Sequence, residues 1–228
     1  MICHNQSLSL GLFYATIPSM SIRYLIIAGP IGVGKSTLTQ RIHESLGFVP
    51  QYEEPDKNPY IEDFYASQYQ EKAFETQLSF LGQRLHHCRQ IQERLHQGQR
   101  VVQDRSIYED CHIFTAHHYQ QGLISERDFQ TYQYLYQGMI DFLPQPDCIV
   151  YLSAPVSQLL ERISERGRDY EQEISSAYLE DLNSLYTGWF KRAKQKGLPI
   201  VELSTHQLSA EQVFQELKTH LSANPVQV

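Results

Sequence analysis

The chain lacks long apolar runs and is short of basic residues. No stretch approaches the roughly 20 apolar residues that a membrane-spanning helix needs, so we expect no membrane partner. Its 19 Lys and Arg are outnumbered by 26 Asp and Glu, which gives a formal net charge of -7 over 228 residues. Because nucleic-acid binding requires clustered cations, we also expect no nucleic-acid partner.

Cysteine is scarce as well, with four residues spread widely and no C-x-x-C pair. Isolated cysteines of this kind are typical of reduced, buried thiols, so the sequence predicts a cytoplasmic protein. The histidine pairs at 86–87 and 117–118 have no acidic or cysteine partner at metal-ligand spacing. We therefore interpret them as residues on helix surfaces and not as metal ligands.

The first 20 residues differ in character from the remainder of the chain. They have no basic segment and their apolar part is broken by serines, which argues against a secretion signal. We expect residues 1–20 to be a disordered extension that activity does not need. The remainder, 21–223, is long enough for a single α/β domain.

The most informative stretch comes directly after an apolar run at 24–28 and reads GPIGVGKST. It fits G-x-x-x-x-G-K-[ST], the phosphate-binding loop between a strand and a helix. Glycines let main-chain N–H groups close on phosphate oxygens, the lysine reaches the β- and γ-phosphates, and the serine holds Mg²⁺. The residues predicted to bind the nucleotide are Gly29, Gly32, Gly34, Lys35, Ser36 and Thr37.

Further short apolar runs alternate with helical patterns along the chain. Strands are expected at 48–52, 100–104, 148–152 and 198–203, with helices between them. Strands that alternate with helices predict an α/β fold with a parallel five-stranded sheet flanked by helices. In such sheets ligands bind at the carboxyl ends of the strands.

Three polar clusters lie at or near those strand ends. They are Glu53-Glu54, Asp104-Arg105-Ser106, and a polar flap at 162–173 that carries Arg162, Arg166 and Arg168. Phosphoryl transfer needs a metal site, cations for the equatorial oxygens and a group that receives the acceptor proton. Ser36 and Asp104 are candidate ligands of Mg²⁺. Lys35, Arg105 and the flap arginines are candidates for the cations at the equatorial oxygens.

The acidic pair also restricts the acceptor. Two carboxylates repel a substrate that already carries a phosphate, and they suit a neutral alcohol that needs a general base. Glu54 stands at a strand end directly before Pro55, which favours it as the base over Glu53.

With these motifs the chain resembles the deoxynucleoside kinases, especially the bacterial deoxyadenosine/deoxyguanosine kinase branch, over roughly residues 22–220. The resemblance lies in GPIGVGKST, EEPDKNPYIEDFY, DRSIYED and RISERGRDYEQEI. It implies a P-loop kinase fold that is usually dimeric through a helix bundle, here the helices at 77–95 and 129–143. The implied reaction moves the γ-phosphoryl group of ATP, with Mg²⁺, to the 5′-hydroxyl of a deoxynucleoside.

The resemblance also implies a role for each matching residue. Glu54 would be the base, Arg105 would steady the transferring group, and the arginines at 162, 166 and 168 would cover the ATP phosphates. Tyr65 would hold the sugar 3′-hydroxyl together with Glu171, and Tyr69 is a rival because of one extra residue before position 77. The residues implied at the nucleobase are Gln77, Arg84 and Asp110.

An Arg/Asp pair favours deoxyadenosine or deoxyguanosine, with deoxycytidine next. A thymidylate-kinase-like enzyme remains an alternative, although it requires an arginine near the acid-Pro pair, where this chain has Glu53. A nucleotide-dependent switch protein would need D-x-x-G and N-K-x-D, and no Asp here has Gly three residues further on.

Overall fold

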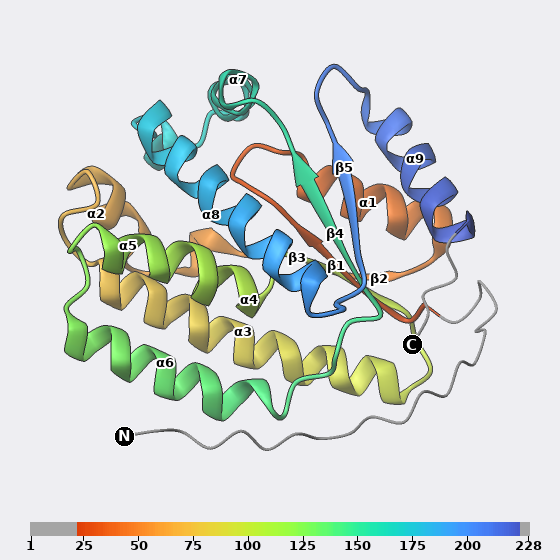
Figure 1. Ribbon diagram of the computed structural model, residues 1–228, viewed down its shortest axis with the longest axis horizontal. Helices are drawn as coiled ribbons and strands as arrows, with labels where there is room; N and C mark the ends of the chain where they lie inside the picture. The colour runs from red at the N-terminus through yellow and green to blue at the C-terminus, as the bar shows by residue number, and fades with distance from the viewer. Residues whose placement is uncertain (1–21, 224–228) are drawn as a thin grey trace.

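The computed structural model describes residues 22–223 and contains one five-stranded sheet (Figure 1). All neighbouring strands are parallel, in the order β2-β3-β1-β4-β5. The predicted parallel sheet flanked by helices is therefore confirmed, whereas the predicted extension at 1–20 lies outside the described residues. The strands are β1 (Tyr24–Ala28), β2 (Val49–Gln51), β3 (Val101–Asp104), β4 (Cys148–Ser153) and β5 (Ile200–Ser204).

Helices of very different length connect these strands. The longer ones are α1 (Lys35–Leu46), α3 (Ala73–His96), α6 (Glu126–Ile140), α7 (Val156–Arg166), α8 (Ser176–Gln195) and α9 (Ala210–Ala223). The shorter ones are α2 (Ile61–Ala66), α4 (Ile107–Glu109) and α5 (Ala116–Gln120). Two single turns, η1 (Pro55–Lys57) and η3 (Asp169–Glu171), and the π-helical η2 (Asp110–Thr115) complete the set.

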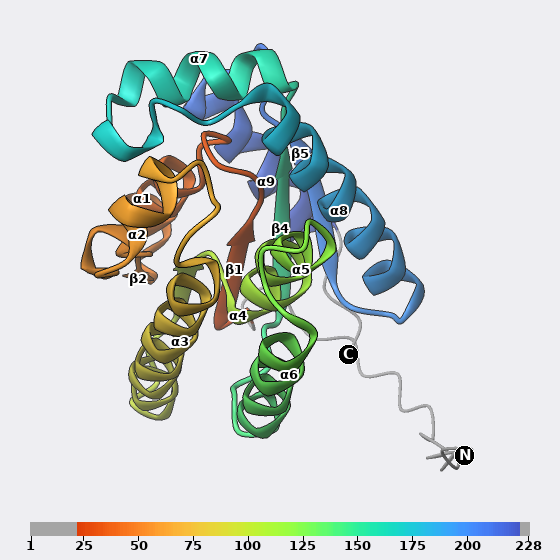
Figure 2. The same ribbon diagram turned by 90° about the vertical axis from the view of Figure 1, so that its left-hand side faces the viewer.

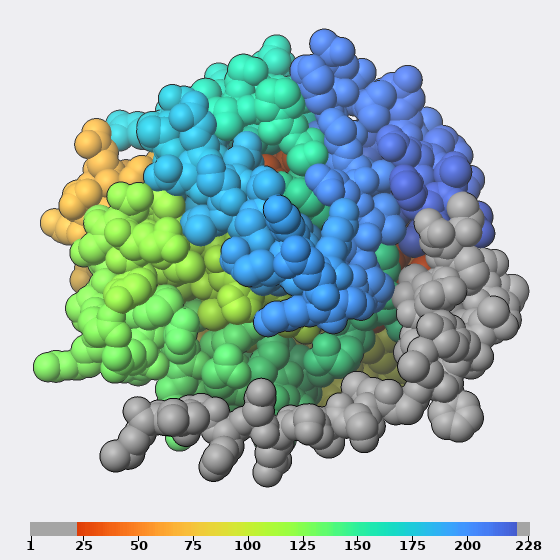
Figure 3. All heavy atoms as spheres, in the orientation of Figure 1, coloured from red at the N-terminus to blue at the C-terminus, as the bar shows by residue number. Residues whose placement is uncertain are grey.

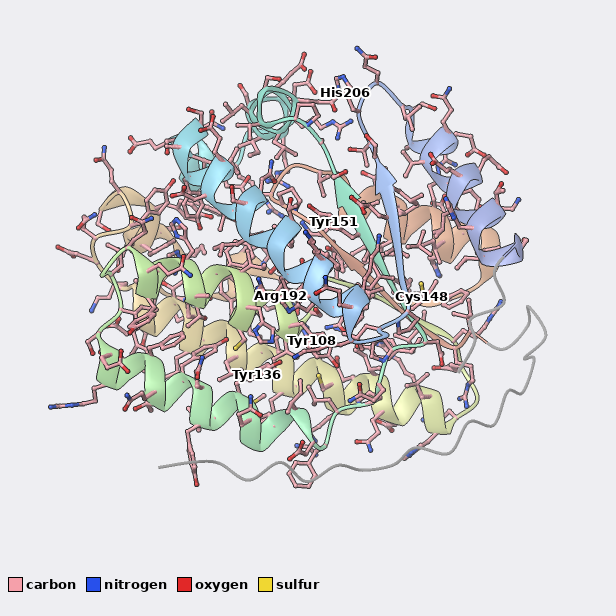
Figure 4. The ribbon with its side chains drawn as sticks, viewed as in Figure 1. Tyr108, Tyr136, Cys148, Tyr151, Arg192 and His206 are labelled. Atoms are coloured by element: carbon pink, nitrogen blue, oxygen red, sulfur yellow. The ribbon has the colours of Figure 1, made fainter. Side chains whose placement is uncertain are left out.

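The core lies on both faces of the sheet. Every residue of β1 and β3 is buried, as expected for central parallel strands covered on two sides. Figures 1 and 2 show α1 and α9 on one face and α8 on the other. Tyr151 of β4, labelled in Figure 4, stacks on Phe190 of α8. The ring centroids are 4.1 Å apart, and this contact fixes the helix against the sheet. Within the described residues no helix is long and apolar enough to cross a membrane.

The strand register positions the site. Ile27 of β1 pairs with Asp104 of β3, and Ala28 pairs with Tyr151 of β4. The phosphate loop and Asp104 therefore leave adjacent strands at the same edge, where parallel sheets bind ligands. Helix α7 passes over this edge (Figure 2), and red atoms from the amino-terminal part of the described chain appear in a recess beside it (Figure 3).

Helix α3 carries an apolar stripe that divides into two parts. Leu81, Cys88 and Ile91 are buried, whereas Leu78 and Leu85 are 37% and 44% exposed. Helical periodicity cannot separate a face that meets the core from one that faces outward, because both need the same spacing. The exposed part points away from the sheet-edge site.

The helical segment that follows β3 is interrupted by η2 at 110–115. A π-helical turn inserts one residue and changes the direction of the side chains beyond it, and such turns are frequent at functional sites. Asp110 and Thr115, at the two ends of η2, are both buried. The sequence contains no periodicity signal for this insertion.

Candidate active site

Two pockets meet at the carboxyl edge of the sheet. The first, which we call the donor pocket, has a volume of about 590 Å³ and lies between the phosphate loop, α7 and the start of α9. The second, the acceptor pocket, lies between η1, α2, α3, η2 and the flap. Both are lined by Lys35, Ser36, Arg166 and Arg168, so these four residues mark the junction of the two pockets.

The phosphate loop has a backbone that side chains would disrupt. Gly29 has φ +146°, and a Cβ there would lie 2.5 Å from the carbonyl oxygen of Leu152. Nζ of Lys35 donates to the carbonyl oxygens of Gly29 and Pro30, at 3.0 Å each, and is therefore held under the loop. Burial and the neighbouring Arg105 lower the pKa of Lys35 to about 8. A polyanion in the donor pocket would favour its charged form.

Ser36 and Asp104 lie together, as predicted for a metal site. The Ser36 hydroxyl donates to Oδ2 of Asp104, while the buried Oδ1 of Asp104 has no hydrogen-bond partner in the described part of the chain. No group of three or more His, Cys, Asp or Glu among residues 22–223 could hold a metal by itself. A hydroxyl and one free carboxylate oxygen fit Mg²⁺, which usually takes few protein ligands and completes its shell with phosphates and water.

Of the adjacent acids Glu53 and Glu54, Glu53 is the one that lines the acceptor pocket. Its Oε1 accepts from NH2 of Arg84 at 2.7 Å, and its Oε2 accepts from Nε of Arg105 at 3.0 Å. Burial alone would raise the pKa of Glu53, but the two guanidinium groups outweigh burial and lower it to about 2. Glu53 is therefore ionised throughout the physiological range.

Glu54, our predicted base, points elsewhere and is not among the residues that line the acceptor pocket. Its side chain is 42% exposed, bonded to Lys57 at 2.7 Å and 3.6 Å from His87. Glu54 lines a different hollow, beside His87 and Arg94 of α3, together with Gln51 and Tyr52. In this geometry Glu54 does not face the acceptor pocket that we predicted it to serve, whereas Glu53 does.

The predicted nucleobase residues come together at the far end of the acceptor pocket. Gln77 and Asp110 line the pocket and are 3% and 2% exposed. Arg84 lies behind them, where its Nε donates to Oδ2 of Asp110 at 2.6 Å. Burial would lower the pKa of Arg84, but Asp110 and Glu53 raise it above its usual range. Arg84 thus orients two carboxylates and does not itself face the pocket.

Both predicted sugar residues line the acceptor pocket, and one of them contacts the junction arginines. Tyr65 and Glu171 both line the acceptor pocket, whereas the rival Tyr69 does not and stacks on Tyr178 at 4.5 Å. Glu171 is 5% exposed and accepts from both Arg166 and Arg168. The flap therefore brings its own carboxylate and two cations to the same place.

Arg162, the third predicted flap arginine, is anchored in a different way. Its guanidinium donates to Oγ1 of Thr205 at 2.9 Å, to the carbonyl oxygen of Thr205 at 3.0 Å and to that of Val33 at 3.3 Å. It lines the donor pocket only. Arg162 thus ties α7 to the phosphate loop and to the end of β5, whereas Arg166 and Arg168 reach the junction.

Sequence analysis missed two residues that support the site, Glu109 and Tyr186. Oε1 of Glu109 accepts from the main-chain N–H of Gly29 at 3.1 Å, and the Tyr186 hydroxyl lies 2.8 Å from the same oxygen. Tyr186 is 157 positions from Gly29, so no local pattern could have indicated the contact. The Glu109 signal was present in Ser106-x-x-Glu109, a capping box that the structure confirms.

A phosphate loop, a paired hydroxyl and carboxylate, and three cations at a shared junction define a P-loop kinase. A family model for deoxynucleoside kinases matches residues 25–226, so the chain belongs to the deoxynucleoside kinase family. The family, fold and enzyme class expected from the sequence are thereby confirmed. The thymidylate-kinase-like alternative is not favoured.

Individual relatives support the same conclusion. The chain is 40% identical to a deoxyadenosine/deoxycytidine kinase of Bacillus subtilis (strain 168) over 175 residues, 76% of this chain and 78% of that protein. It is 33% identical to a deoxyguanosine kinase of the same organism over 176 residues, 75% and 80% of the two chains. A structure of deoxyadenosine kinase from M. mycoides, with the products dCMP and a flexible dCDP bound, matches with a TM-score of 0.75 at 27% identity and covers 87% and 98% of the two chains.

The buried ion pairs of Glu53 predict how stability depends on pH. Folding lowers the pKa of Glu53 from 4.5 to about 2, so its stabilising effect is present above pH 4.5 and is lost as the pH falls toward 2. Between pH 7 and pH 3, the free energy of unfolding of the wild type should fall by about 2 kcal/mol more than that of Glu53→Gln. Urea denaturation at both pH values measures this difference. Glu54→Gln is the matched control, and equal acid sensitivity of wild type and Glu53→Gln would contradict the buried pairing.

Proposed function

We propose that the protein transfers the γ-phosphoryl group of ATP to the 5′-hydroxyl of a deoxynucleoside. The observation that carries this proposal is the position of Glu53 and Arg105 in the acceptor pocket, next to the Lys35 and Ser36 junction with the donor pocket. An uncharged alcohol can approach the ionised Glu53, whereas an acceptor phosphate would be repelled by it. The same carboxylate therefore selects nucleosides over nucleotides.

Ser36 and the free oxygen of Asp104 are the residues that would hold Mg²⁺. When bound, the metal neutralises charge on the transferring phosphoryl group. Lys35, Arg166 and Arg168 supply further positive charge around the same phosphates, and Arg105 lies on the acceptor side. The unpartnered Oδ1 of Asp104 supports this assignment.

Glu53 receives the proton of the 5′-hydroxyl in this proposal. A carboxylate with a pKa of about 2 is a weak base, so it does not remove the proton before the reaction starts. In a loose phosphoryl-transfer transition state, the acceptor oxygen becomes acidic only as its bond to phosphorus forms. Glu53 therefore orients the hydroxyl first and accepts its proton late.

The nucleobase end favours a base whose exocyclic amino group adjoins a ring nitrogen, as in adenine, guanine and cytosine. The Asp110 carboxylate only accepts hydrogen bonds, and Gln77 offers an amide with both a donor and an acceptor. Deoxyadenosine is the preferred substrate in this proposal, with deoxycytidine second, in keeping with the deoxyadenosine/deoxycytidine kinase at 40% identity.

We further propose that residues 162–173 are a lid on the single kinase domain at 21–223. The free volume of the acceptor pocket is about 80 Å³, well below the roughly 300 Å³ or more of typical ligand sites. Arg166 and Arg168 line this pocket and pair with Glu171 inside it. Entry of a nucleoside requires these contacts to open.

A homodimer through α3 and α6 is part of the same proposal. Leu78 and Leu85 on α3 and Leu135 on α6 are large apolar side chains left 37–44% exposed, and the two helices pack against each other. A cytoplasmic location is proposed from the cysteines: Cys88, Cys111 and Cys148 are free and buried, as in proteins of reducing compartments.

The direct test is a substrate panel. ADP release is followed with ATP and Mg²⁺ in the presence of each of the four deoxynucleosides, and of dTMP as the phosphorylated acceptor. We expect the largest kcat/KM for deoxyadenosine and no turnover of dTMP. A higher kcat/KM for dTMP than for any nucleoside would overturn the proposal.

Asp110→Ala tests the nucleobase assignment. Removal of the acceptor carboxylate should lower the ratio of kcat/KM for deoxyadenosine to that for thymidine by about tenfold or more, the size of one hydrogen bond to a charged group. A ratio of two substrates in one preparation does not depend on the folded fraction. Glu216→Ala, which removes an exposed acid on α9, is the control. An unchanged ratio in Asp110→Ala would remove Asp110 from the nucleobase site.

Leu85→Asp tests the interface. Light scattering after gel filtration should give twice the chain mass for the wild type and the single mass for the variant, because a charge in an apolar interface is costly to bury. Leu198→Asp is the matched control, since Leu198 is 37% exposed, close to the 44% of Leu85, but precedes β5. A monomeric wild type, or a dimer that survives Leu85→Asp, would contradict this interface.

A further inference from the structure

A buried polar junction connects the phosphate loop to Arg105. Its centre is Glu109, whose side chain is completely buried at the end of α4. Besides the contacts of its Oε1 with Gly29 and Tyr186, its Oε2 accepts from the main-chain N–H of Ser106 at 2.9 Å. The Glu109 carboxylate thus joins Gly29 after β1, Ser106 after β3 and Tyr186 in the middle of α8.

Tyr186 connects this junction to Arg105. NH1 of Arg105 donates to the Tyr186 hydroxyl oxygen at 3.0 Å. The hydroxyl also lies 2.9 Å from the carbonyl oxygen of Gly29, which accepts from Nζ of Lys35. The Tyr186 hydroxyl therefore contacts Arg105 on the acceptor side. It also contacts the carbonyl group that holds Lys35 on the donor side.

Arg105 needs such support. Its φ of 64° is in the left-handed region, which is unfavourable for a residue with a side chain and persists only where surrounding contacts enforce it. Its guanidinium carbon lies 4.5 Å from the centre of the Phe114 ring, and its Nε is bonded to Glu53. Because Nε is bonded to Glu53, the NH1 side of the guanidinium is the side that Tyr186 and Glu109 support.

We propose that Tyr186 and Glu109 are positioning residues that hold Arg105 in register with the phosphate loop during phosphoryl transfer. The inference rests on the proposed function and adds two residues to it. Preorganised cations act on charge that develops in the transition state, so their misplacement lowers the rate of the chemical step more than the binding of ground-state substrates. Glu109 acts on Arg105 mainly through the Tyr186 hydroxyl, since its own oxygen is 3.7 Å from NH1.

Tyr186→Phe is the decisive variant, because it removes the hydroxyl and keeps the ring. The ring stacks on Tyr151 with centroids 5.8 Å apart, so packing between β4 and α8 is retained. We expect kcat to fall about tenfold, the effect of one lost hydrogen bond to a charged group, with the KM values for ATP and deoxynucleoside within about twofold. Tyr136→Phe on α6 (Figure 4) is the control, since it also removes the hydroxyl of a buried tyrosine, one bonded to His112 outside the site.

A double-mutant cycle shows whether Tyr186 acts through Arg105. In the Arg105→Lys background, single-turnover transfer should be nearly insensitive to Tyr186→Phe, because the NH1 contact is already lost. Equal rate losses in the two backgrounds would overturn the inference, as would an unchanged kcat in Tyr186→Phe or a loss confined to KM. Glu109→Gln should lower kcat in the same way, and thermal denaturation reports whether it folds.

The measurement on the wild type distinguishes failure of this inference from failure of the proposed function. If the wild type fails to phosphorylate any deoxynucleoside, the proposed function is wrong and the inference falls with it. If the wild type is active and Tyr186→Phe matches the Tyr136→Phe control, the inference alone is wrong.

Discussion

The buried contacts of Glu53 with Arg84 and Arg105 are the interaction on which the rest of the site depends. They join three segments that meet only in the folded chain: the loop after β2, helix α3 and the end of β3. Burying ions is costly, and the pairs offset that cost only while every partner is present, so removal of one partner from such a pair typically costs about 3–5 kcal/mol. The arrangement therefore fixes the direction of one carboxylate in the acceptor pocket.

The network around this carboxylate separates donor and acceptor chemistry. Positive charge gathers at the junction, where Lys35, Arg166 and Arg168 line both pockets, whereas Asp110 and Glu171 line only the acceptor pocket. The cations at the junction favour a negatively charged ligand, and the acids of the acceptor pocket favour a neutral alcohol. The flap spans both, because Arg166 and Arg168 are paired with Glu171 in the described structure.

Much of this could be predicted from sequence because the signals are local. The phosphate loop is a contiguous motif, and the strands are short apolar runs at regular intervals, so the fold and the Ser36–Asp104 pair could be inferred directly. Tyr65 and Gln77 needed the family resemblance to be assigned. The structure places Glu53, and not the predicted Glu54, in the acceptor pocket. Two adjacent carboxylates look alike in a sequence, and their directions depend on where the extended chain after β2 turns.

Other features had no local signal at all. Tyr186 reaches Gly29 across 157 positions, and the π-helical turn at 110–115 leaves no trace in the periodicity. The two halves of the α3 stripe have the same spacing, although one is buried and the other exposed. These features arise from packing between distant segments, and only the folded chain determines them.

The central claim is that Glu53, and not its neighbour Glu54, serves the acceptor hydroxyl. The most direct measurement is single-turnover transfer from ATP to deoxyadenosine by Glu53→Gln and Glu54→Gln, two isosteric changes at adjacent positions. We predict a rate loss of about 100-fold or more for Glu53→Gln, the size expected for loss of a general base, and a rate within about threefold of wild type for Glu54→Gln. The opposite order, or near-normal transfer by Glu53→Gln, would contradict the account.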